Sequence, residues 1–201
     1  MSEMGARTPS RIMLVRHGRS AHVLEDRWVD AAGVHRWREG YDAAGVQPAS
    51  MPPPALVSDA ARADLVVASD LARAVASAER LAAGREVRIS PLLRESMLDI
   101  PTWLPARWPL IVWGIAIHLQ WLTRTARRIS INPVEQQRVS AAVDWLEDVI
   151  REHRSIVVVT HGVFRGLVGA ELVSRGWTAE RRMSGYQHWS VWPYIIDREP
   201  A

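Results

Sequence analysis

Three short apolar runs constrain the fold of this chain most, because each has the length of one buried strand and each ends in polar residues. They are RIMLVR at 11–16, LVVAS at 65–69 and SIVVVT at 155–160. Short runs rich in valine and isoleucine predict strands that are buried on both faces. Helical patterns follow or precede them at 71–83, 133–153 and 163–174. Alternating strands and helices predict an α/β fold, a three-layer α/β/α sandwich around a mainly parallel sheet.

Shorter patterns complete the predicted sheet. Residues 86–90 are expected to form a further strand and 189–196 a closing strand. Residues 19–63 have weak periodicity and many turn formers, so the sequence assigns no helix or strand there. Asp70 is expected to cap the helix at 71–83, and Pro133 to start the helix at 133–153. A chain of 201 residues is expected to form one domain, 1–201.

The segment 101–128 is expected to be a cap or insertion with an apolar helix from 108. Its apolar run is too short to span a bilayer, because a spanning helix needs roughly 20 apolar residues. Its tryptophans are expected to form a satellite core, a substrate wall or a dimer contact, and contact with a membrane surface is the minority alternative. They are Trp103, Trp108, Trp113 and Trp121. Its basic edge (Arg124, Arg127 and Arg128) is either a solvated face or a lid that recognises acidic groups of a substrate.

The composition excludes several kinds of chemistry. The chain has no cysteine, which rules out disulfides, thiolate metal sites and a cysteine nucleophile. It also has no lysine, which rules out Schiff-base catalysis. The formal net charge of +3 is too mild to predict nucleic-acid binding. The polar start, Met1–Ser10, lacks the apolar stretch of a signal peptide, so a cytoplasmic protein is expected.

Polar side chains stand where the predicted strands end. In open α/β sheets, ligands bind outside the carboxyl ends of the strands. We therefore expect two histidines, two arginines and a glutamate to meet in one crevice. They lie in Arg16-His17-Gly18, in the stretch from Ser69 to Arg73, at Glu95 and in His161-Gly162.

Four sequence pieces around these residues resemble the histidine phosphatase superfamily, which includes the cofactor-dependent phosphoglycerate mutases. The pieces are LVRHGRSA (14–21), ASDLARAVASA (68–78), PLLRES (91–96) and VVVTHG (157–162), and their order and spacing also match. The resemblance implies a phosphoglycerate mutase-like fold. It also implies a phosphomonoester hydrolase that works through a phosphohistidine and needs no cofactor.

The resemblance further implies a role for each residue. His17 is expected to be the nucleophile, Glu95 the general acid, and His161 the residue that stabilises the transferring group. The phosphoryl oxygens are expected to bind Arg16, Arg73 and Gly162. The expected partners are a phosphorylated small molecule and inorganic phosphate as its product, and a homodimer is possible.

General chemistry agrees with these roles. A histidine must be neutral to attack phosphorus, and nearby arginines disfavour its protonated form. Arginine forks suit the negative charge that spreads over the phosphoryl oxygens in the transition state. The leaving oxygen needs a proton from an acid. A metal site made of the same two histidines and the glutamate is disfavoured, because the two arginines nearby repel a cation.

The chain departs from the family pattern just after the first motif. Arg19 stands where many members have Glu or Gln, and Val23 where many have Asn. We expect Arg19, Ser20 and His22 to be pocket residues, with His22 a substitute polar contact. Two alternatives to the phosphatase follow: a phosphomutase on the same site, and a catalytically weak phospholigand-binding protein. The short chain favours the phosphatase over the mutase.

Overall fold

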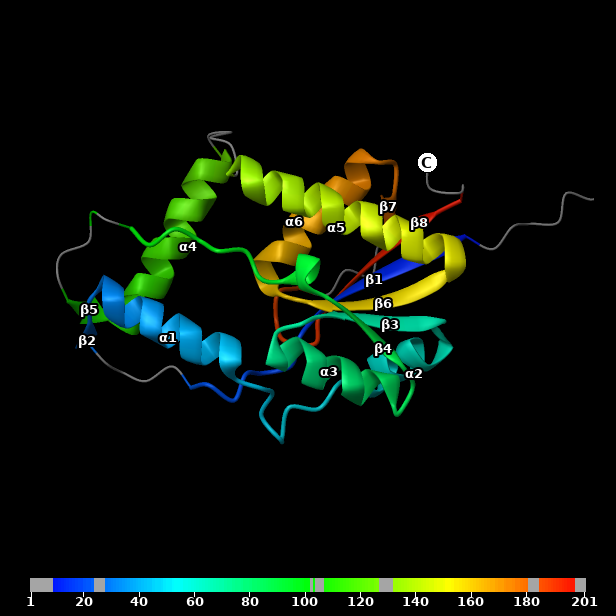
Figure 1. Ribbon diagram of the computed structural model, residues 1–201, viewed down its shortest axis with the longest axis horizontal. Helices are drawn as coiled ribbons and strands as arrows, with labels where there is room; N and C mark the ends of the chain where they lie inside the picture. The colour runs from blue at the N-terminus through cyan, green and yellow to red at the C-terminus, as the bar shows by residue number, and fades with distance from the viewer. Residues whose placement is uncertain are drawn as a thin grey trace, which may run out of the picture.

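A computed structural model describes residues 9–23, 28–101, 103, 107–126, 132–180 and 185–197, the side chains of 124–126 excepted. Its centre is a six-stranded sheet with the strand order β4-β3-β6-β1-β8-β7 (Figure 1). The strands are β1 (Ser10–Arg16), β3 (Leu65–Ser69), β4 (Val87–Ser90), β6 (Ser155–Thr160), β7 (Thr178–Ala179) and β8 (Val191–Ile196). Strands β4, β3, β6 and β1 are parallel, and β8 is antiparallel to β1 and β7. The predicted mainly parallel sheet is confirmed.

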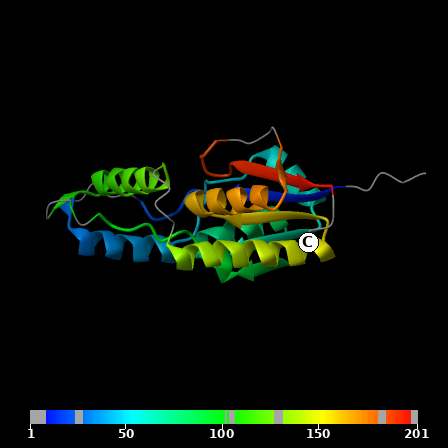
Figure 2. The same cartoon turned by 90° about the horizontal axis from the view of Figure 1, so that it is seen from above.

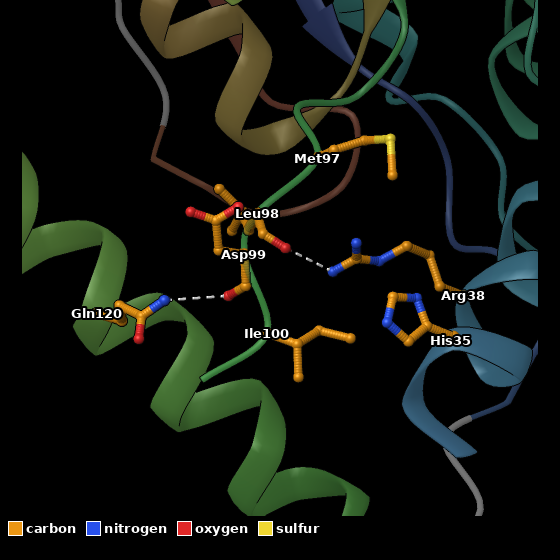
Figure 3. Close-up of a pocket in the computed structure, with 7 residues that line it drawn as sticks. All are labelled: His35, Arg38, Met97, Leu98, Asp99, Ile100 and Gln120. Carbon is orange, nitrogen blue, oxygen red and sulfur yellow. Dashed lines mark hydrogen bonds between the residues drawn. The ribbon is translucent and has the colours of Figure 1, made fainter. Parts of the chain in front are cut away.

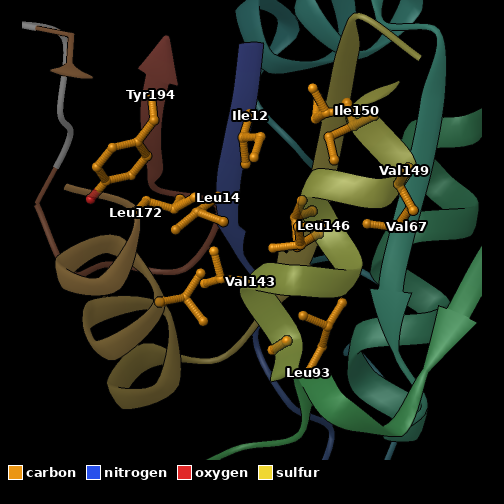
Figure 4. Packing of buried hydrophobic residues seen from close by; sticks show 14 of the residues in the cluster. Ile12, Leu14, Val67, Leu93, Val143, Leu146, Val149, Ile150, Leu172 and Tyr194 are labelled. Carbon is orange, nitrogen blue, oxygen red and sulfur yellow. The ribbon is translucent and has the colours of Figure 1, made fainter. Parts of the chain in front are cut away.

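Helices cover both faces of this sheet, which gives the predicted three layers (Figures 1 and 2). On one face lie α5 (Pro133–Glu152) and α6 (Gly162–Ser174), whose apolar side chains pack on Ile12, Leu14 and Val158 (Figure 4). On the other face lie α2 (Pro54–Arg62) and α3 (Ala72–Ala82), packed on Met13 and Val157. Alternate residues of each strand therefore point to opposite cores, as expected for a sheet buried on both sides.

A cap lies beside one end of the sheet (Figure 2). It consists of α1 (Ala31–Ala43), α4 (Leu110–Ala126) and a small sheet of β2 (Trp28–Val29) and β5 (Trp108–Pro109). Its own core buries Val34, Leu110, Trp113 and Ile117. Trp113 also donates its indole N–H to the carbonyl of Val29 over 3.0 Å, so the satellite-core interpretation holds for this tryptophan. The predicted apolar helix of the insertion is confirmed.

Part of the insertion lies outside the described residues, including Arg127, Arg128 and the side chain of Arg124, so the predicted basic edge is not described. Within the ranges that the structure describes, no helix combines the length and the apolar character needed to cross a membrane.

Helices α1 and α2 both lie within residues 19–63, where the sequence shows only weak periodicity. Helix α1 buries only Gly33 and Val34 and so leaves no apolar stripe at helical spacing. The local signal that marks it is Asp30, whose carboxylate accepts the N–H of Gly33 over 2.7 Å. Helix α2 starts at Pro54, a residue that suits a first helical turn.

The expected cap at Asp70 is also wrong. Leu71 occupies the N-cap position of α3 and makes no side-chain cap bond. The two carboxylate oxygens of Asp70 instead accept N–H groups of Arg94 over 2.7 and 2.6 Å. A bidentate charged pair is stronger than a neutral cap bond, so the distant arginine takes the carboxylate.

Candidate active site

His17 follows directly on β1 and is almost fully buried. Its Nδ1 lies 2.7 Å from the carbonyl oxygen of Gly18, an atom that can only accept, so the proton sits on Nδ1. This leaves a lone pair on Nε2. The backbone geometry needs glycine at position 18, since an added Cβ would lie 2.5 Å from the ring of Trp189. The sequence around β1 thus presents a neutral imidazole whose Nε2 can act only as an acceptor.

His161 lies beside His17, with 5.1 Å between the ring centroids. It comes from the end of β6 and is the N-cap residue of α6. Its Nε2 lies 3.0 Å from the hydroxyl of Ser69, which in turn accepts the N–H of Leu71 over 3.3 Å. We therefore assign the hydroxyl proton to the bond with Nε2 and the ring proton to Nδ1. That Nδ1 is buried and has no hydrogen-bond partner.

Arg73 brings a positive charge onto the free nitrogen of His17. It is the second residue of α3 and is fully buried, and its Nε lies 3.3 Å from Nε2 of His17. Its Nη1 donates to the carbonyl of Tyr41 over 2.9 Å and to the carboxylate of Asp42 over 3.0 Å. The guanidinium also lies over the Tyr41 ring, 4.2 Å from the centroid. Residues of α1 therefore hold one edge of the guanidinium, and its other edge faces His17.

Arg16 and Gly162 meet on the other side of the histidines. Arg16 ends β1 and donates from Nη1 to the carbonyl of Tyr186. Its Nε is buried and has no hydrogen-bond partner. A Cβ at Gly162 would lie 3.4 Å from Nε and Cζ of Arg16, so this position is in direct contact with the guanidinium. Two unpaired polar groups, Arg16 Nε and His161 Nδ1, thus remain at the helix end where an anion is favoured.

The electrostatics of the site favour neutral histidines. Burial, and then the charge of Arg73, hold the pKa of His17 well below its ordinary value of 6.5. Burial, and then His17 and Arg73, lower the pKa of His161 in the same direction. Both rings are therefore uncharged at neutral pH, as a phosphorus nucleophile and its neighbour require.

Glu95 lies at the start of α6, two residues after the 3₁₀ turn η1 (Pro91–Leu93). One of its carboxylate oxygens accepts the N–H of Phe164 over 2.9 Å and that of Ser96 over 3.0 Å. The hydrogen bonds of the described residues place it on the first turn of the helix that His161 caps, and not on either histidine. The carboxylate nevertheless acts on the site: burial raises the pKa of Tyr41, Arg73 and Arg16 oppose this, and Glu95 adds a smaller upward effect.

Two site residues were missed in the sequence. Tyr41 comes from α1, which had no visible pattern, and covers Arg73. His188 lies in the segment before β8, with its ring centroid 5.5 Å from that of His17 and its Nδ1 3.2 Å from the carbonyl of His17. Burial, and then Arg16, lower the pKa of His188. A single histidine before the last strand has no sequence pattern that predicts a position in the site.

The three expected pocket residues lie close to the site. The backbone N–H of Arg19 donates to the Ser50 hydroxyl over 2.8 Å, and its side chain is exposed. Ser20 is buried and accepts the N–H of His22 over 3.1 Å. The His22 ring packs on Trp37 at 5.5 Å and has a buried, unpaired Nε2.

A cavity of about 460 Å³ lies between α1, α4 and the segment 97–100 (Figure 3). One wall is α1, which carries His35 and Arg38 one to two turns before Tyr41. The other is the segment 97–100, which follows Glu95, and Gln120 of α4 closes the end. Arg38 donates to the carbonyl of Leu98 over 2.9 Å, and Gln120 to that of Asp99 over 3.3 Å. Among the described residues, no group of three His, Asp or Glu side chains is arranged to hold a metal ion.

Comparison with solved structures supports this fold. The chain is similar to a mycobacterial glucosyl-3-phosphoglycerate phosphatase in complex with VO3, with a TM-score of 0.55, 20% identity, and coverage of 82% of this chain and 81% of that one. It is also similar to a phosphoserine phosphatase from Entamoeba histolytica, with a TM-score of 0.52, 17% identity, and coverage of 82% and 80%. A mycobacterial hydrolase gives a TM-score of 0.54 at 18% identity, with coverage of 83% and 73%.

No protein-family model and no curated protein matches the chain. At these identities the likeness establishes the fold, which is the phosphoglycerate mutase-like fold expected from the four motifs. The expected resemblance to histidine phosphatases is confirmed at this level.

Proposed function

We propose that the chain is a metal-independent phosphomonoester hydrolase of the histidine phosphatase superfamily that transfers phosphate through His17. The observation that carries the proposal is the state of this ring: Nδ1 is bonded to the Gly18 carbonyl, and Nε2 faces a buried arginine. The similar structures with phosphatase names support the reaction class. The substrate is a phosphorylated small molecule, and the product is inorganic phosphate.

Substrate binding uses the polar groups around His17. The phosphoryl group approaches Nε2 of His17, and its oxygens take over the N–H of Arg73 Nε that now bonds to this nitrogen. The unpaired N–H groups of Arg16 Nε and His161 Nδ1 are the further donors. Arg73 stays in position because Tyr41 and Asp42 hold its other edge. Gly162 lies beside Arg16. Fixed cations of this kind stabilise charge as it develops on the equatorial oxygens.

The first step forms a bond between Nε2 of His17 and phosphorus and breaks the bond from phosphorus to the leaving oxygen. The electron pair of that bond goes to the leaving oxygen, which takes a proton from Glu95. The ring becomes positively charged, and the Gly18 carbonyl stabilises this charge through the N–H of Nδ1. In the second step Glu95 takes a proton from water, and the water oxygen bonds to phosphorus. The bond between phosphorus and Nε2 of His17 breaks, and its electron pair returns to Nε2.

The leaving group is assigned to the cavity along the cap. Arg38 lies one helical turn before Tyr41, about 4.5 Å along the axis of α1. Arg38, His35 and Gln120 offer hydrogen bonds there, and Leu98 and Ile100 offer apolar contact. This lining suits an extended polar group such as a sugar. An Arg38→Ala variant is expected to raise the KM for sugar phosphates about tenfold and to leave that for p-nitrophenyl phosphate unchanged, since one lost hydrogen bond to a charged group is worth about 1.5 kcal/mol.

The reaction is tested by hydrolysis of p-nitrophenyl phosphate in EDTA, with wild type beside His17→Ala and, as the matched control, His153→Ala at the end of α5. We expect activity in wild type and in the control, and a loss of more than about a thousandfold in His17→Ala. When the reaction with phosphate-labelled substrate is quenched, a labelled phosphoenzyme is expected in wild type only. Its label is expected to be lost in acid. Vanadate is expected to inhibit.

Other outcomes have distinct meanings. Activity that EDTA abolishes overturns the metal-independent reaction. Transfer to an added alcohol in preference to water identifies a phosphomutase. Tight phosphate binding without turnover on a broad panel of phosphomonoesters identifies a phospholigand-binding protein. Cell fractionation tests the proposed cytoplasmic location.

A further inference from the structure

The outer face of α4 is apolar although it is exposed. Ile111, Ile115, Leu119 and Leu122 follow one another at spacings of four, four and three residues, which places them on one side of the helix. Between 52 and 55% of each of these side chains is accessible. We call these four residues the α4 stripe. The opposite side of α4, with Trp113 and Ile117, packs in the core of the cap.

This pattern is unlike that of the other surface helices. A helix on the surface of a water-soluble domain places charged residues opposite its buried face. From Leu110 to Thr123 the sequence of α4 has no Asp, Glu, Lys or Arg. His118 is also exposed, but its Nδ1 bonds back to the Gly114 carbonyl over 2.7 Å. A helix that is apolar on both sides fits a second apolar environment outside the molecule.

Two exposed tryptophans lie beside the helix, one before its first turn and one against Gln120. Trp28 is 59% exposed and pairs with Pro109, directly before α4. Trp103 is 69% exposed and donates its indole N–H to Gln120 over 3.3 Å. Tryptophan is the side chain most suited to the boundary between water and lipid, because its ring is apolar and its N–H is polar.

The charge of this part of the chain has one sign. From residue 100 to residue 134 the sequence contains four arginines and no Asp or Glu. Among the described residues, Arg107 is exposed and bonds to the carbonyl of Trp28 over 3.1 Å, which places a cation beside one of the two tryptophans. Basic residues beside an apolar face attract anionic lipid headgroups.

We infer that the α4 stripe docks on a membrane surface that contains anionic lipid, with the helix lying in the interface. A second copy of the chain fits less well. A two-fold contact through α4 sets this all-positive segment against itself, with no carboxylate to pair it. Four aliphatic residues on three turns of one helix are also a small area for a stable dimer, which needs on the order of 1,200 Å² or more. The inference does not depend on the proposed reaction.

The test is co-sedimentation of the full chain with vesicles, either pure phosphatidylcholine or phosphatidylcholine with phosphatidylglycerol. We compare wild type with Ile115→Gln/Leu119→Gln. The matched control is Val134→Gln/Val173→Gln, which makes the same chemical change at two exposed positions, 71 and 52% accessible, on other helices. All positions are exposed, and thermal unfolding by circular dichroism verifies that each variant folds.

We expect wild type and control to bind vesicles with phosphatidylglycerol and the stripe variant to bind roughly tenfold less, because two buried aliphatic side chains are lost. Raising the salt to 0.5 M is expected to weaken wild-type binding. Absence of wild-type binding, or equal loss in both variants, overturns the inference. A dimer in light scattering that the stripe variant dissociates, without vesicle binding, assigns the stripe to a second copy instead.

Discussion

The Nε atom of Arg73 lies 3.3 Å from Nε2 of His17, the ring nitrogen that carries the lone pair. The same arginine is pinned by Asp42 and the carbonyl of Tyr41, both at the end of α1. Arg73 therefore has two effects: it adds to burial, the larger cause, in lowering the pKa of His17, and in the proposed reaction it holds a donor where the phosphoryl oxygens arrive. The second effect depends on the planar shape of the guanidinium and not on its charge alone.

Arg73→Lys is accordingly expected to lose about a hundredfold in kcat/KM although it keeps the charge. A lysine ammonium cannot bind Asp42 and face His17 at the same time, so one transition-state donor is lost. Initial rates on p-nitrophenyl phosphate measure the effect. The control is Arg62→Lys, at an arginine whose side chain is 70% exposed on α2. An Arg73→Lys enzyme with wild-type kcat/KM contradicts the role of the fork.

Gly18→Ala is expected to destabilise the fold by about 1–3 kcal/mol, because a Cβ there would lie 2.5 Å from the ring of Trp189 and 2.9 Å from Val46. The Trp189 ring is fixed in turn by a 3.0 Å bond to the Ser50 hydroxyl, so it cannot yield easily. Urea unfolding measures the change. Gly45→Ala is the matched control, since nothing lies within 4 Å of its added Cβ. Equal midpoints for the two variants contradict the close approach.

Ser69→Ala is expected to lower kcat about tenfold and to change KM little. The hydroxyl holds the proton of His161 on Nδ1, toward the phosphoryl group, so its loss frees the ring to adopt the other tautomer. A role in folding alone would leave kcat unchanged in the folded fraction. Ser58→Ala, at an exposed serine bonded to the Pro54 carbonyl, is the control. Unchanged kcat in Ser69→Ala contradicts the assigned tautomer.

The parts of the site that could be predicted are those fixed by strands. His17 and His161 directly follow β1 and β6, which pair in parallel with Arg16 opposite Thr160. Adjacent parallel strands bring residues at their carboxyl ends together, so two rings that directly follow such strands lie side by side. Arg73 follows by the same rule from β3, at the start of its helix.

The other parts depend on contacts between distant segments. Tyr41 and Asp42 reach the site only because α1 packs in the core of the cap. Helix α1 buries too few side chains to show a helical pattern in the sequence. Asp70 has a good cap sequence, yet Arg94 binds its carboxylate from 24 residues away. His188 is placed by the chain ahead of β8, where no strand end predicts it. Local patterns contain no information on such partners.

The buried histidines are expected to make both activity and stability fall on the acid side. The pKa of His17 and of His161 lies well below 6.5 in the folded chain, whereas both rings have ordinary pKa values when unfolded. The unfolded chain therefore binds more protons below pH 6.5, and the free energy of unfolding decreases as the pH falls through 6.5. Each histidine contributes at most about 1.4 kcal/mol per pH unit until its folded pKa is reached.

Urea unfolding between pH 5 and 8 measures this slope, and His161→Gln is expected to make it shallower because one titrating ring is removed. The matched control is His153→Gln, at a histidine on the end of α5. The same low pKa of His17 keeps the nucleophile neutral below pH 6.5, so the acid limb of kcat/KM is expected to have its midpoint below that value. A midpoint above pH 6.5, or equal slopes for wild type and His161→Gln, contradicts neutral buried histidines.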